Sequence, residues 1–536
     1  MKNTVLVSCV VAALGLSGIV IATASSAPAP ASTPSAAVVA TVYVNTRTGD
    51  DSNDGQTAAT AFKTVNWALE YMDNLGQPLT GEIIVRAPAN YPVAPAGYGG
   101  SEQTGWQSPD PFPLVLVEGV TLKGITLSNN RPVITIDESS ASFTAWNRSV
   151  VTLADRSAIV NFEIDGSRLT SSSTGANGNQ VFVGVLVDRG EAEIRNCVIT
   201  DWHTEVWVEP IVGLPVTLDI WRTTLSKAGP IGDPGEGHAA LTFVGSGTAT
   251  INLDESTIES SHDAFETYGN TGYFLNRATA PGTQLPNPGS VILNITDCVF
   301  DCNENGLEIG GINNVDIYVK DSSFLNHRPH TDAPIVVTNP PYSMPPLPGQ
   351  NTAIGIRGYK GGTSVASVPI NSEAFIHVRN CEFKDYSIAV ACDAENASAK
   401  IDLGTAVPFS PGLNVFCQSF ALTVDGCDPG NGLDPLESYR VAVWQASSTP
   451  MGAAPNVIEA AGNWWIPDNQ DTPGAGNRII TGLKGTYTTG LHVVGIPHGM
   501  SDPRNYAIER PAIGENCGQI NFGPVMSIGA PPVSCP

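Results

Sequence analysis

The chain has 536 residues, of which 42% are hydrophobic and 14% are charged, and 51 Asp and Glu against 26 Lys and Arg give a formal charge of −25. The apolar fraction excludes an intrinsically disordered acidic chain. The excess of acids argues against nucleic acid as a partner and against electrostatic attraction to anionic lipid. The 54 Gly and 41 Pro indicate a β protein with many turns.

The amino terminus has the features of a secretory signal peptide. Lys2 supplies a positive charge, an apolar run follows from Val5 to Ile21, and Ala22-Thr23-Ala24 is a cleavage site of small residues. We therefore expect residues 1–24 to be removed and the protein to be secreted, to the extracellular space or the cell surface. An uncleaved anchor helix is the alternative. Residues 25–40 are rich in Ala, Pro and Ser and are predicted to be a flexible linker, and no other stretch is long enough to span a bilayer.

The first part of the mature chain contains an acidic loop. Asp50, Ser52, Asp54 and Gly55 match the start of an EF-hand loop, but Ala61 stands at the twelfth position, where that loop needs Glu. Asp50 and Asp54 are therefore candidate calcium ligands outside an EF-hand. A turn held by side-chain hydrogen bonds is the alternative.

Residues 61–74 have the periodicity of a helix with one apolar face. Phe62, Val65, Leu69 and Met72 lie on that face. We expect this helix to cover the first end of the fold.

A short pattern then returns along the chain: an apolar residue, any residue, Asn or Asp, a small residue, any residue, and an apolar residue. Ile295-Thr296-Asp297-Cys298-Val299-Phe300 is one clear copy. A polar turn and a second short strand follow each copy, and such strands must stack on their neighbours to bury their apolar faces. The pattern predicts a parallel β-solenoid with a ladder of residues at the small position: Phe162, Cys197, Thr223, Ser256, Cys298, Ser322 and Cys381. We expect the ladder cysteines to be packing residues, with disulfide partners or ligands as the alternative.

Several segments resemble the opening and closing motifs of known proteins. They are Tyr43-Val44-Asn45, the loop at 49–57, Ala61-Phe62-Lys63-Thr64-Val65, the strand at 83–91, and, near the other end, Gly462-Asn463-Trp464-Trp465. The opening resembles a bacterial domain of unknown function that begins secreted right-handed parallel β-helix proteins of the pectin-lyase-like superfamily. Ala61 replaces the usual Pro, and Ile466 replaces the Gly of the closing motif.

The resemblance implies an all-β fold, a right-handed parallel β-helix, with an N-terminal capping helix and an irregular C-terminal tail. The expected divisions are a cap with the first rungs at 41–130, the β-helix at 131–466 and the tail at 467–536. The superfamily hosts lyases, hydrolases, epimerases and non-catalytic proteins, so the fold implies no single activity. The motifs of polygalacturonases, pectate lyases and alginate epimerases are incomplete or absent in this sequence.

Equal offsets from the ladder should stack on successive rungs, about 4.8 Å apart. Six residues after it fall His203, His262 and Glu304, and an alignment across a turn insertion places His238 there too. Ten residues after it fall Trp207, Glu266 and Glu308, and the same alignment across the insertion adds Thr242. Tyr268 follows two positions further along its rung. One face of the solenoid is therefore predicted to collect imidazoles, carboxylates and aromatic rings.

This face has the composition of a carbohydrate groove. Glu266 and Glu308 on adjacent rungs would lie about 5 Å apart, the separation of a retaining glycosidase pair, and His262 is the third catalytic candidate. Trp207 and Tyr268 would offer flat faces to sugar rings, and the remaining substrate-binding candidates are His203, His238 and Glu304. A cation held by His and carboxylate, or a solvated polar turn, are the alternatives.

Two functions therefore stay open. The first is a secreted protein that binds extracellular polysaccharide along the solenoid and, if the carboxylates are an acid–base pair, cleaves it as a lyase or glycoside hydrolase. A neutral or calcium-bridged glycan suits the net acidity better than a bare polyuronate. The second is a non-catalytic cell-surface or matrix protein that acts as a spacer or adhesin. Neither requires a cofactor other than a candidate calcium ion.

Overall fold

The computed structural model describes the chain from residue 38 to residue 521, with gaps. The described residues are 38–86, 97–98, 113–125, 131–135, 149–167, 183–210, 213–228, 239–244, 247–267, 289–303, 305–310, 314–326, 352–360, 373–384, 388–395, 398–406, 409–417, 441–445, 448–450, 457–466, 483–486, 492–495, 506–509, 515–517 and 519–521. The predicted signal peptide and most of the predicted linker lie outside them.

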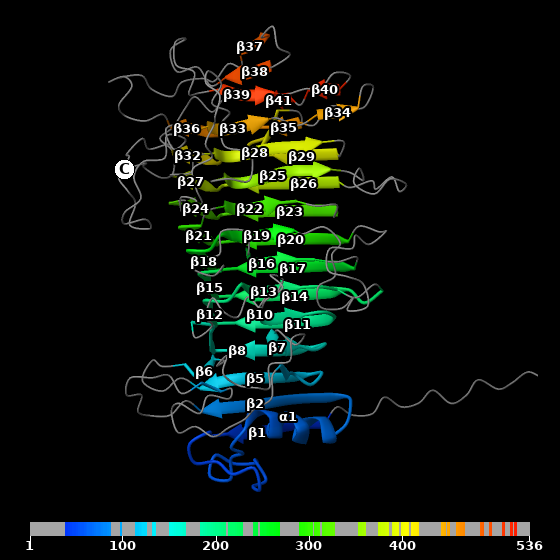
Figure 1. The fold of residues 1–536 in the computed structure, drawn as a ribbon, viewed down its shortest axis with the longest axis vertical. Coiled ribbons are helices and arrows are strands. Elements are labelled where there is room, and N and C mark those ends of the chain that lie inside the picture. The colour runs from blue at the N-terminus through cyan, green and yellow to red at the C-terminus, as the bar shows by residue number, and fades with distance from the viewer. Residues whose placement is uncertain are drawn as a thin grey trace, which may run out of the picture.

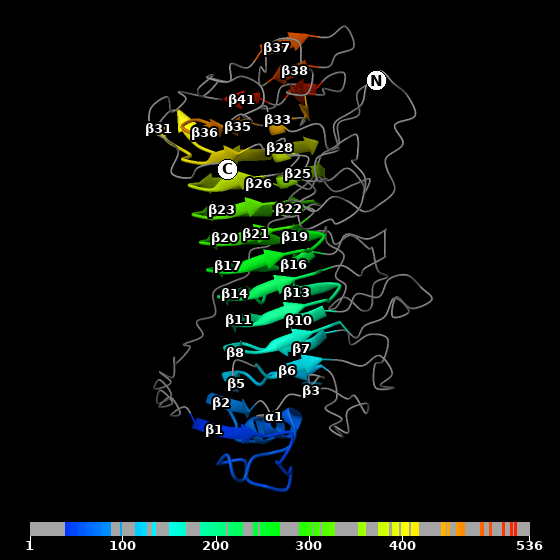
Figure 2. The same cartoon turned by 90° about the vertical axis from the view of Figure 1, so that its left-hand side faces the viewer.

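The described strands form three long sheets that run the length of the molecule (Figures 1 and 2). Sheet A has 13 strands in the order β1 (Val38–Val44), β2 (Leu79–Arg86), β5 (Val120–Ile125), β8 (Ser157–Val160), β11 (Gly190–Arg195), β14 (Val216–Trp221), β17 (Thr248–Asp254), β20 (Ser290–Thr296), β23 (Asn314–Lys320), β26 (Glu373–Arg379), β29 (Ser398–Asp402), β35 (Val457–Glu459) and β41 (Gln519–Asn521).

Sheet B has 11 strands and its members are short. They are β3 (Gly97–Tyr98), β6 (Val133–Thr135), β9 (Glu163–Asp165), β12 (Val198–Thr200), β15 (Thr224–Ser226), β18 (Thr257–Glu259), β21 (Val299–Asp301), β24 (Ser323–Leu325), β27 (Glu382–Lys384), β32 (Val415–Cys417) and β36 (Trp464–Ile466).

Sheet C has 12 strands. They are β4 (Leu114–Val115), β7 (Ser149–Leu153), β10 (Val183–Val187), β13 (Thr204–Val208), β16 (Ala239–Phe243), β19 (Asp263–Thr267), β22 (Asn305–Ile309), β25 (Thr352–Lys360), β28 (Ile388–Glu395), β34 (Ser448–Pro450), β40 (Glu515–Cys517) and, beside β28, β33 (Val441–Gln445). Neighbouring strands pair in parallel, apart from β34 with β40. The predicted parallel β-helix is confirmed.

The Asn or Asp of the sequence repeat makes the turn from sheet A to sheet B. Asn196, Asp297 and Asn380 have φ values of 52°, 52° and 54°. This left-handed conformation costs most L-residues energy, and Asn and Asp tolerate it best. The repeat therefore reflects a two-residue corner that recurs on the coils from β8–β9 to β26–β27. On two of them Arg222 and Glu255 take the left-handed position instead, with φ values of 49° and 44°.

The ladder residue that follows this corner points into the core. Thr223 Oγ1 accepts a hydrogen bond from the Cys197 amide at 3.3 Å, and Ser256 Oγ accepts one from the Thr223 amide at 3.1 Å. Ser322 does the same for Cys298 at 3.1 Å. Small hydroxyl side chains thus satisfy buried amides of the preceding rung, where an unpaired amide would destabilise the fold.

The ladder cysteines are packing residues, as predicted. Cys197, Cys298 and Cys381 are buried free thiols, and Cys392 is a fourth. Burial raises the pKa of Cys197 to about 11 and of Cys298 to about 12, so these thiols are not nucleophilic at neutral pH. Cys302 takes part in a disulfide bond.

A stack of aromatic rings lines sheet B inside the core. Phe300, Phe324, Phe383 and Phe416 follow one another with ring centroids 4.5, 5.1 and 4.8 Å apart and planes 5° from parallel. All four side chains are buried. Each ring packs on the next at the rung spacing, which fixes the register of four consecutive coils.

The amino-terminal end is closed by the predicted helix. Helix α1 (Val65–Asn74) begins after Thr64, whose side chain accepts a hydrogen bond from the Trp67 amide, and it lies beside β1 and β2 (Figure 1). Val65, Leu69 and Met72 are buried, and Phe62 packs just before the helix. The capping helix is confirmed, beginning at residue 65.

The end of the chain carries more strands than its sequence pattern indicates. Strand β41 extends sheet A by pairing with β35. Strands β37 (Leu483–Thr486), β38 (His492–Gly495) and β39 (Tyr506–Glu509) form a small antiparallel sheet, and β30 (Thr405–Ala406) pairs with β31 (Phe409–Ser410). These strands are short and lack the repeat, so the pattern does not reveal them.

One buried acid breaks the apolar pattern of the core. Glu205 in β13 is fully buried, and it takes the register position that Ala240 and Ala264 occupy on the next two rungs. Neither of its carboxyl oxygens has a hydrogen-bond partner among the described residues. Burial raises the pKa of Glu205 well above its usual value of 4.5.

This acid is expected to make stability depend on pH. The folded state holds the Glu205 proton more tightly than the unfolded state does. Protonated Glu205 therefore contributes its full stabilisation of the folded state below about pH 4.5, and this contribution is lost as the pH rises toward the folded pKa. Relative to Glu205→Gln, wild type should lose about 1.4 kcal/mol of unfolding free energy per pH unit in that interval. Urea unfolding of both proteins between pH 4 and pH 8 measures the difference. Curves that stay parallel would contradict a protonated, buried Glu205.

Candidate functional site

The outer face of sheet C contains the predicted column of residues. The register pairs Trp207 with Thr242, Thr242 with Glu266, and Glu266 with Glu308. The column predicted from the ladder is therefore present in the structure. Adjacent parallel strands lie about 4.8 Å apart, so Glu266 and Glu308 are neighbours on β19 and β22.

Glu308 is held by a chain of hydrogen bonds that crosses the two rungs. Asn305 Nδ2 donates to Glu308 Oε2 at 3.2 Å and to Asp263 Oδ1 at 2.6 Å. Asp263 Oδ2 lies 3.0 Å from His262 Nδ1. We call these four residues together with Glu266 the sheet C cluster. Strand β19 contributes Asp263 and Glu266, and strand β22 contributes Asn305 and Glu308. The stacking of these two adjacent rungs therefore fixes the cluster.

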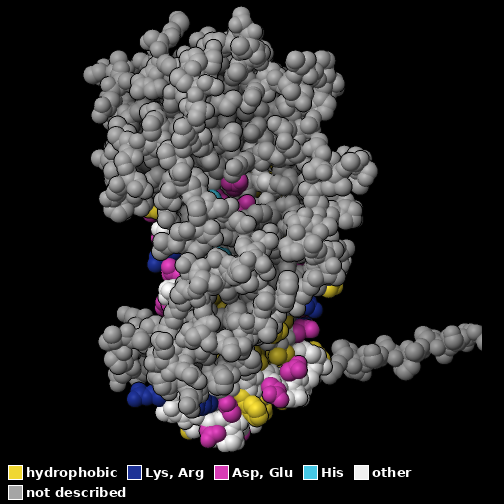
Figure 3. Space-filling model, viewed as in Figure 1, with side chains coloured by type: hydrophobic (Ala, Val, Ile, Leu, Met, Phe, Trp, Pro, Cys, Tyr) yellow, Lys and Arg dark blue, Asp and Glu magenta, His cyan; other side chains and the backbone are white. Residues whose placement is uncertain are grey.

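The cluster combines buried and accessible groups. Asp263 and Asn305 are 1% exposed and Glu308 is 7% exposed, whereas the His262 side chain is 31% exposed. Glu266 is half-buried. Acidic and histidine side chains are visible midway along the face shown in Figure 3. Two carboxyl groups of different exposure, side by side on a rigid sheet, can divide the roles of nucleophile and proton donor.

Two cluster members were missed by the sequence analysis. Asp263 and Asn305 both lie seven residues after their ladder positions and pair with each other in the register. Side chains ten residues after the ladder face outward, so strict alternation along a strand would point the side chains at the seventh position into the core. Instead Ala264 and Phe265 both face the core, so the two outward positions are three residues apart. The identical offset of Asp and Asn on neighbouring rungs was the available signal.

Trp207 corrects the expectation of an open sugar platform. The side chain is 1% exposed and packs with Val183, Leu186 and Val244 in a small apolar cluster outside the main core. Its indole Nε1 donates to Glu209 Oε2 at 3.0 Å. The sequence offset correctly gives the direction of the side chain, but it carries no information about what covers that face. His203 is likewise buried, at 4% exposed.

Three predicted substrate-binding residues cannot be placed on this face. His238, Tyr268 and Glu304 lie outside the described residues. Their roles stay predictions.

The acidic loop near the amino terminus is organised by its own hydrogen bonds. Asp50 accepts from the amide and the hydroxyl of Ser52, and these bonds lower its pKa. Asp54 accepts from the Thr60 hydroxyl at 2.6 Å and from the Gln56 amide. This arrangement is that of side-chain turns. Within the described ranges, no group of three or more His, Cys, Asp or Glu is placed to hold a metal ion.

No helix within the described ranges is both long and apolar enough to cross a membrane.

Comparisons with known proteins give limited similarity. No family model matches the sequence, and no curated protein matches it. Among solved structures, the native lacto-N-biosidase of family GH136 from Eubacterium ramulus is 12% identical with a TM-score of 0.27, and its selenomethionine derivative is 11% identical with a TM-score of 0.28. Each match covers 71% of this chain, which spans 64% of the other. The activity in those names belongs to those proteins, and the function of this chain is argued from its own residues.

Proposed function

We propose that this protein binds extracellular polysaccharide on the outer face of sheet C and hydrolyses glycosidic bonds there with Glu266 and Glu308. One observation carries the proposal: the two glutamates occupy the same register position on adjacent strands. Parallel strands place such residues about 5 Å apart, as in a retaining glycosidase. Position in the pectin-lyase-like superfamily and secretion belong to the same proposal and rest on the sequence resemblance and the signal peptide.

Each residue has a defined part in this reaction. Glu308, oriented by Asn305, attacks the anomeric carbon, and Glu266 donates its proton to the leaving oxygen. A water molecule then attacks the glycosyl ester, gives its proton to Glu266 and releases Glu308 as carboxylate. Asp263 accepts the second hydrogen bond of Asn305 and so keeps the amide directed at the nucleophile.

A product screen tests the proposal. The secreted form is incubated with a panel of neutral and acidic polysaccharides, in calcium and in chelator, and new reducing ends and unsaturated products are measured. We expect reducing ends with wild type and none with Glu308→Gln. Glu191→Gln is the matched control, because this exposed glutamate lies on sheet A, away from the cluster. Unsaturated products, or products that persist in Glu308→Gln, would overturn hydrolysis by this pair.

A second function is favoured by the burial of the cluster. Glu308, Asp263 and Asn305 are almost inaccessible, which suits a polar network that stiffens a non-catalytic surface or matrix protein. In that case the screen would give glycan binding, or neither binding nor products, equally in all variants. Products that form with wild type and Glu191→Gln but not with Glu308→Gln would exclude this alternative.

A further inference from the structure

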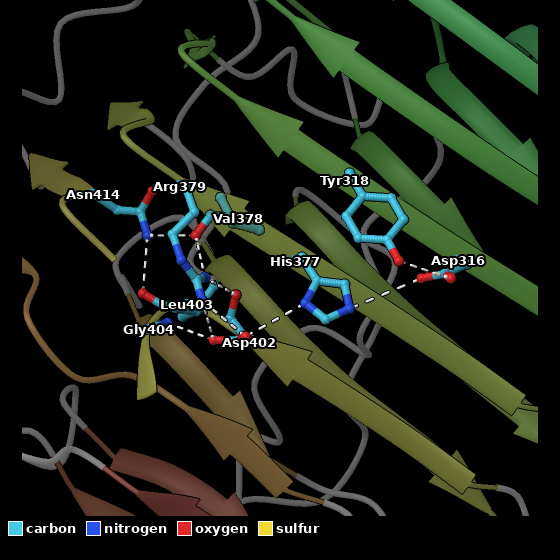
Figure 4. Close-up of polar contacts among 9 residues, drawn as sticks. All are labelled: Asp316, Tyr318, His377, Val378, Arg379, Asp402, Leu403, Gly404 and Asn414. Carbon is cyan, nitrogen blue, oxygen red and sulfur yellow. Dashed lines mark hydrogen bonds and ion pairs between the residues drawn. The ribbon is translucent and has the colours of Figure 1, made fainter. Parts of the chain in front are cut away.

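The outer face of sheet A carries a second polar cluster, on β23, β26 and β29 (Figure 4). It consists of Asp316, Tyr318, His377, Arg379 and Asp402, which we call the sheet A cluster. The register pairs Tyr318 with His377 and His377 with Asp402. None of these residues belongs to the sheet C cluster, so the inference below is independent of the proposed function.

The imidazole of His377 is fixed from two sides. Its ring is stacked on Tyr318, with centroids 4.8 Å apart and planes 5° from parallel, and its Nδ1 lies 3.4 Å from Asp402 Oδ2. When Nδ1 carries the proton and donates it to this carboxylate, Nε2 keeps a free lone pair. The ring is thereby set in the tautomer and orientation of a metal ligand.

Asp402 is itself held rigidly. Arg379 Nη2 contacts both carboxylate oxygens at 2.9 and 2.8 Å, and the Gly404 amide donates to Oδ1 at 2.8 Å. Burial alone would raise the pKa of Asp402, but the hydrogen bonds from His377 and Arg379 hold it well below the usual range. An ionised carboxylate behind His377 keeps the imidazole oriented as a ligand.

Asp316 faces the other nitrogen of the ring. Its Oδ2 accepts a hydrogen bond from the Tyr318 hydroxyl at 3.0 Å, and its Oδ1 lies 3.9 Å from His377 Nε2. This Oδ1 atom is buried and has no hydrogen-bond partner among the described residues. The separation is too long for a hydrogen bond. Two ligand atoms about 2.1 Å from a tetrahedral ion lie about 3.4 Å apart, so a shift of about 0.5 Å would let both bind one ion.

We propose that His377 Nε2 and Asp316 Oδ1 form a binding site for a divalent transition-metal ion of the zinc type. One imidazole with one carboxylate suits zinc better than calcium or magnesium, which prefer oxygen ligands alone. The Asp316 and His377 side chains are 38% and 33% exposed, so solvent reaches both residues although the Oδ1 atom itself is buried. With two protein ligands the ion stays accessible to an oxygen donor from outside the chain.

Zinc titration of the mature protein, produced without a histidine tag, tests the site. Calorimetry and competition with a chromogenic chelator should give one ion per chain at pH 7.5. His377→Phe keeps a ring beside Tyr318 but removes the ligand, and Asp316→Asn removes the carboxylate charge; each should weaken binding at least tenfold. Asp402→Asn changes no ligand and should weaken it roughly 10- to 100-fold. His262→Ala, which removes the histidine of the sheet C cluster, is the matched control and should bind as wild type.

Two further readouts separate a lost ligand from a damaged fold. Zinc should raise the Tm of wild type and of His262→Ala but leave that of His377→Phe unchanged, because only a bound ion stabilises the folded state. Binding should also weaken as the pH falls, because protons compete with the metal for its ligands. Absence of binding to wild type, or binding that His377→Phe leaves intact, would overturn the proposal. Loss in His262→Ala alone would overturn it as well and place the ion on sheet C.

Discussion

Glu308→Gln is expected to lower kcat roughly 10⁴-fold on a cleavable glycan, while the Tm stays close to that of wild type. Loss of a nucleophile costs this much because the remaining groups cannot form the covalent intermediate. The amide of Gln keeps the shape of the side chain and its place beside Asn305, so binding should survive. Kinetics on the substrate found in the product screen, together with an affinity measurement, check both halves of the expectation.

Glu266→Gln supplies the complementary control. A general acid contributes roughly 10²- to 10⁴-fold, and its contribution vanishes when the leaving group needs no proton. We therefore expect Glu266→Gln to be slow on a natural glycan and nearly normal in the first step on a dinitrophenyl glycoside. Equal losses on both substrates, or exchanged behaviour of the two variants, would contradict the assigned roles.

Phe324→Ala is expected to destabilise the protein by about 3–5 kcal/mol, the usual loss for a large buried aromatic residue. Phe324 is fully buried and its ring stacks on both Phe300 and Phe383, so its removal leaves a cavity in the middle of four stacked rings. In a solenoid each rung contacts only its neighbours, and the damage should spread to the adjacent coils. Urea unfolding followed by circular dichroism measures the loss.

Phe375→Ala is the matched control for this loss. Phe375 lies on β26 and faces outward, half-buried on the surface of sheet A, so the same chemical change should cost about 1 kcal/mol or less. If the free energy of unfolding falls equally in the two variants, the aromatic stack does not contribute more to stability than a surface ring does.

The fold could be predicted from the sequence because a two-residue corner leaves a strong signature. Asn196 and Asp297 must adopt a left-handed conformation, and Cys197 and Cys298 must be small enough to follow them into the core. The two-residue corner recurs on the coils from β8–β9 to β26–β27, whatever the length of the loops between them. The strands after residue 466 carry no such corner, and the sequence did not reveal them.

The site could be predicted only in part. Counting from the ladder placed Glu266 and Glu308 together, because the register is constant between β19 and β22. The same count could not tell that Trp207 is covered, since burial depends on contacts across the sheet surface. It also missed Asp263 and Asn305, because two successive inward residues interrupt the alternation.

The sequence did not predict the sheet A cluster, for a different reason. Asp316 and His377 lie on adjacent strands, but Asp316 is six residues and His377 four residues before the ladder positions Ser322 and Cys381. A fixed offset therefore pairs His377 with Tyr318 and not with Asp316. The diagonal approach of the two side chains also depends on the stacking of His377 on Tyr318, which no spacing rule expresses.

The most direct measurement is peptide mapping of the protein after reaction with a 2-deoxy-2-fluoro glycosyl fluoride of the sugar that it releases. Such a probe forms the glycosyl ester quickly and hydrolyses slowly, so it marks the nucleophile. The account predicts a single adduct on the peptide that contains Glu308, absent in Glu308→Gln and present in Glu191→Gln. An adduct on another residue, or a wild-type protein that cleaves the glycan but remains unlabelled, would contradict the assignment of Glu308 as the nucleophile on the outer face of sheet C.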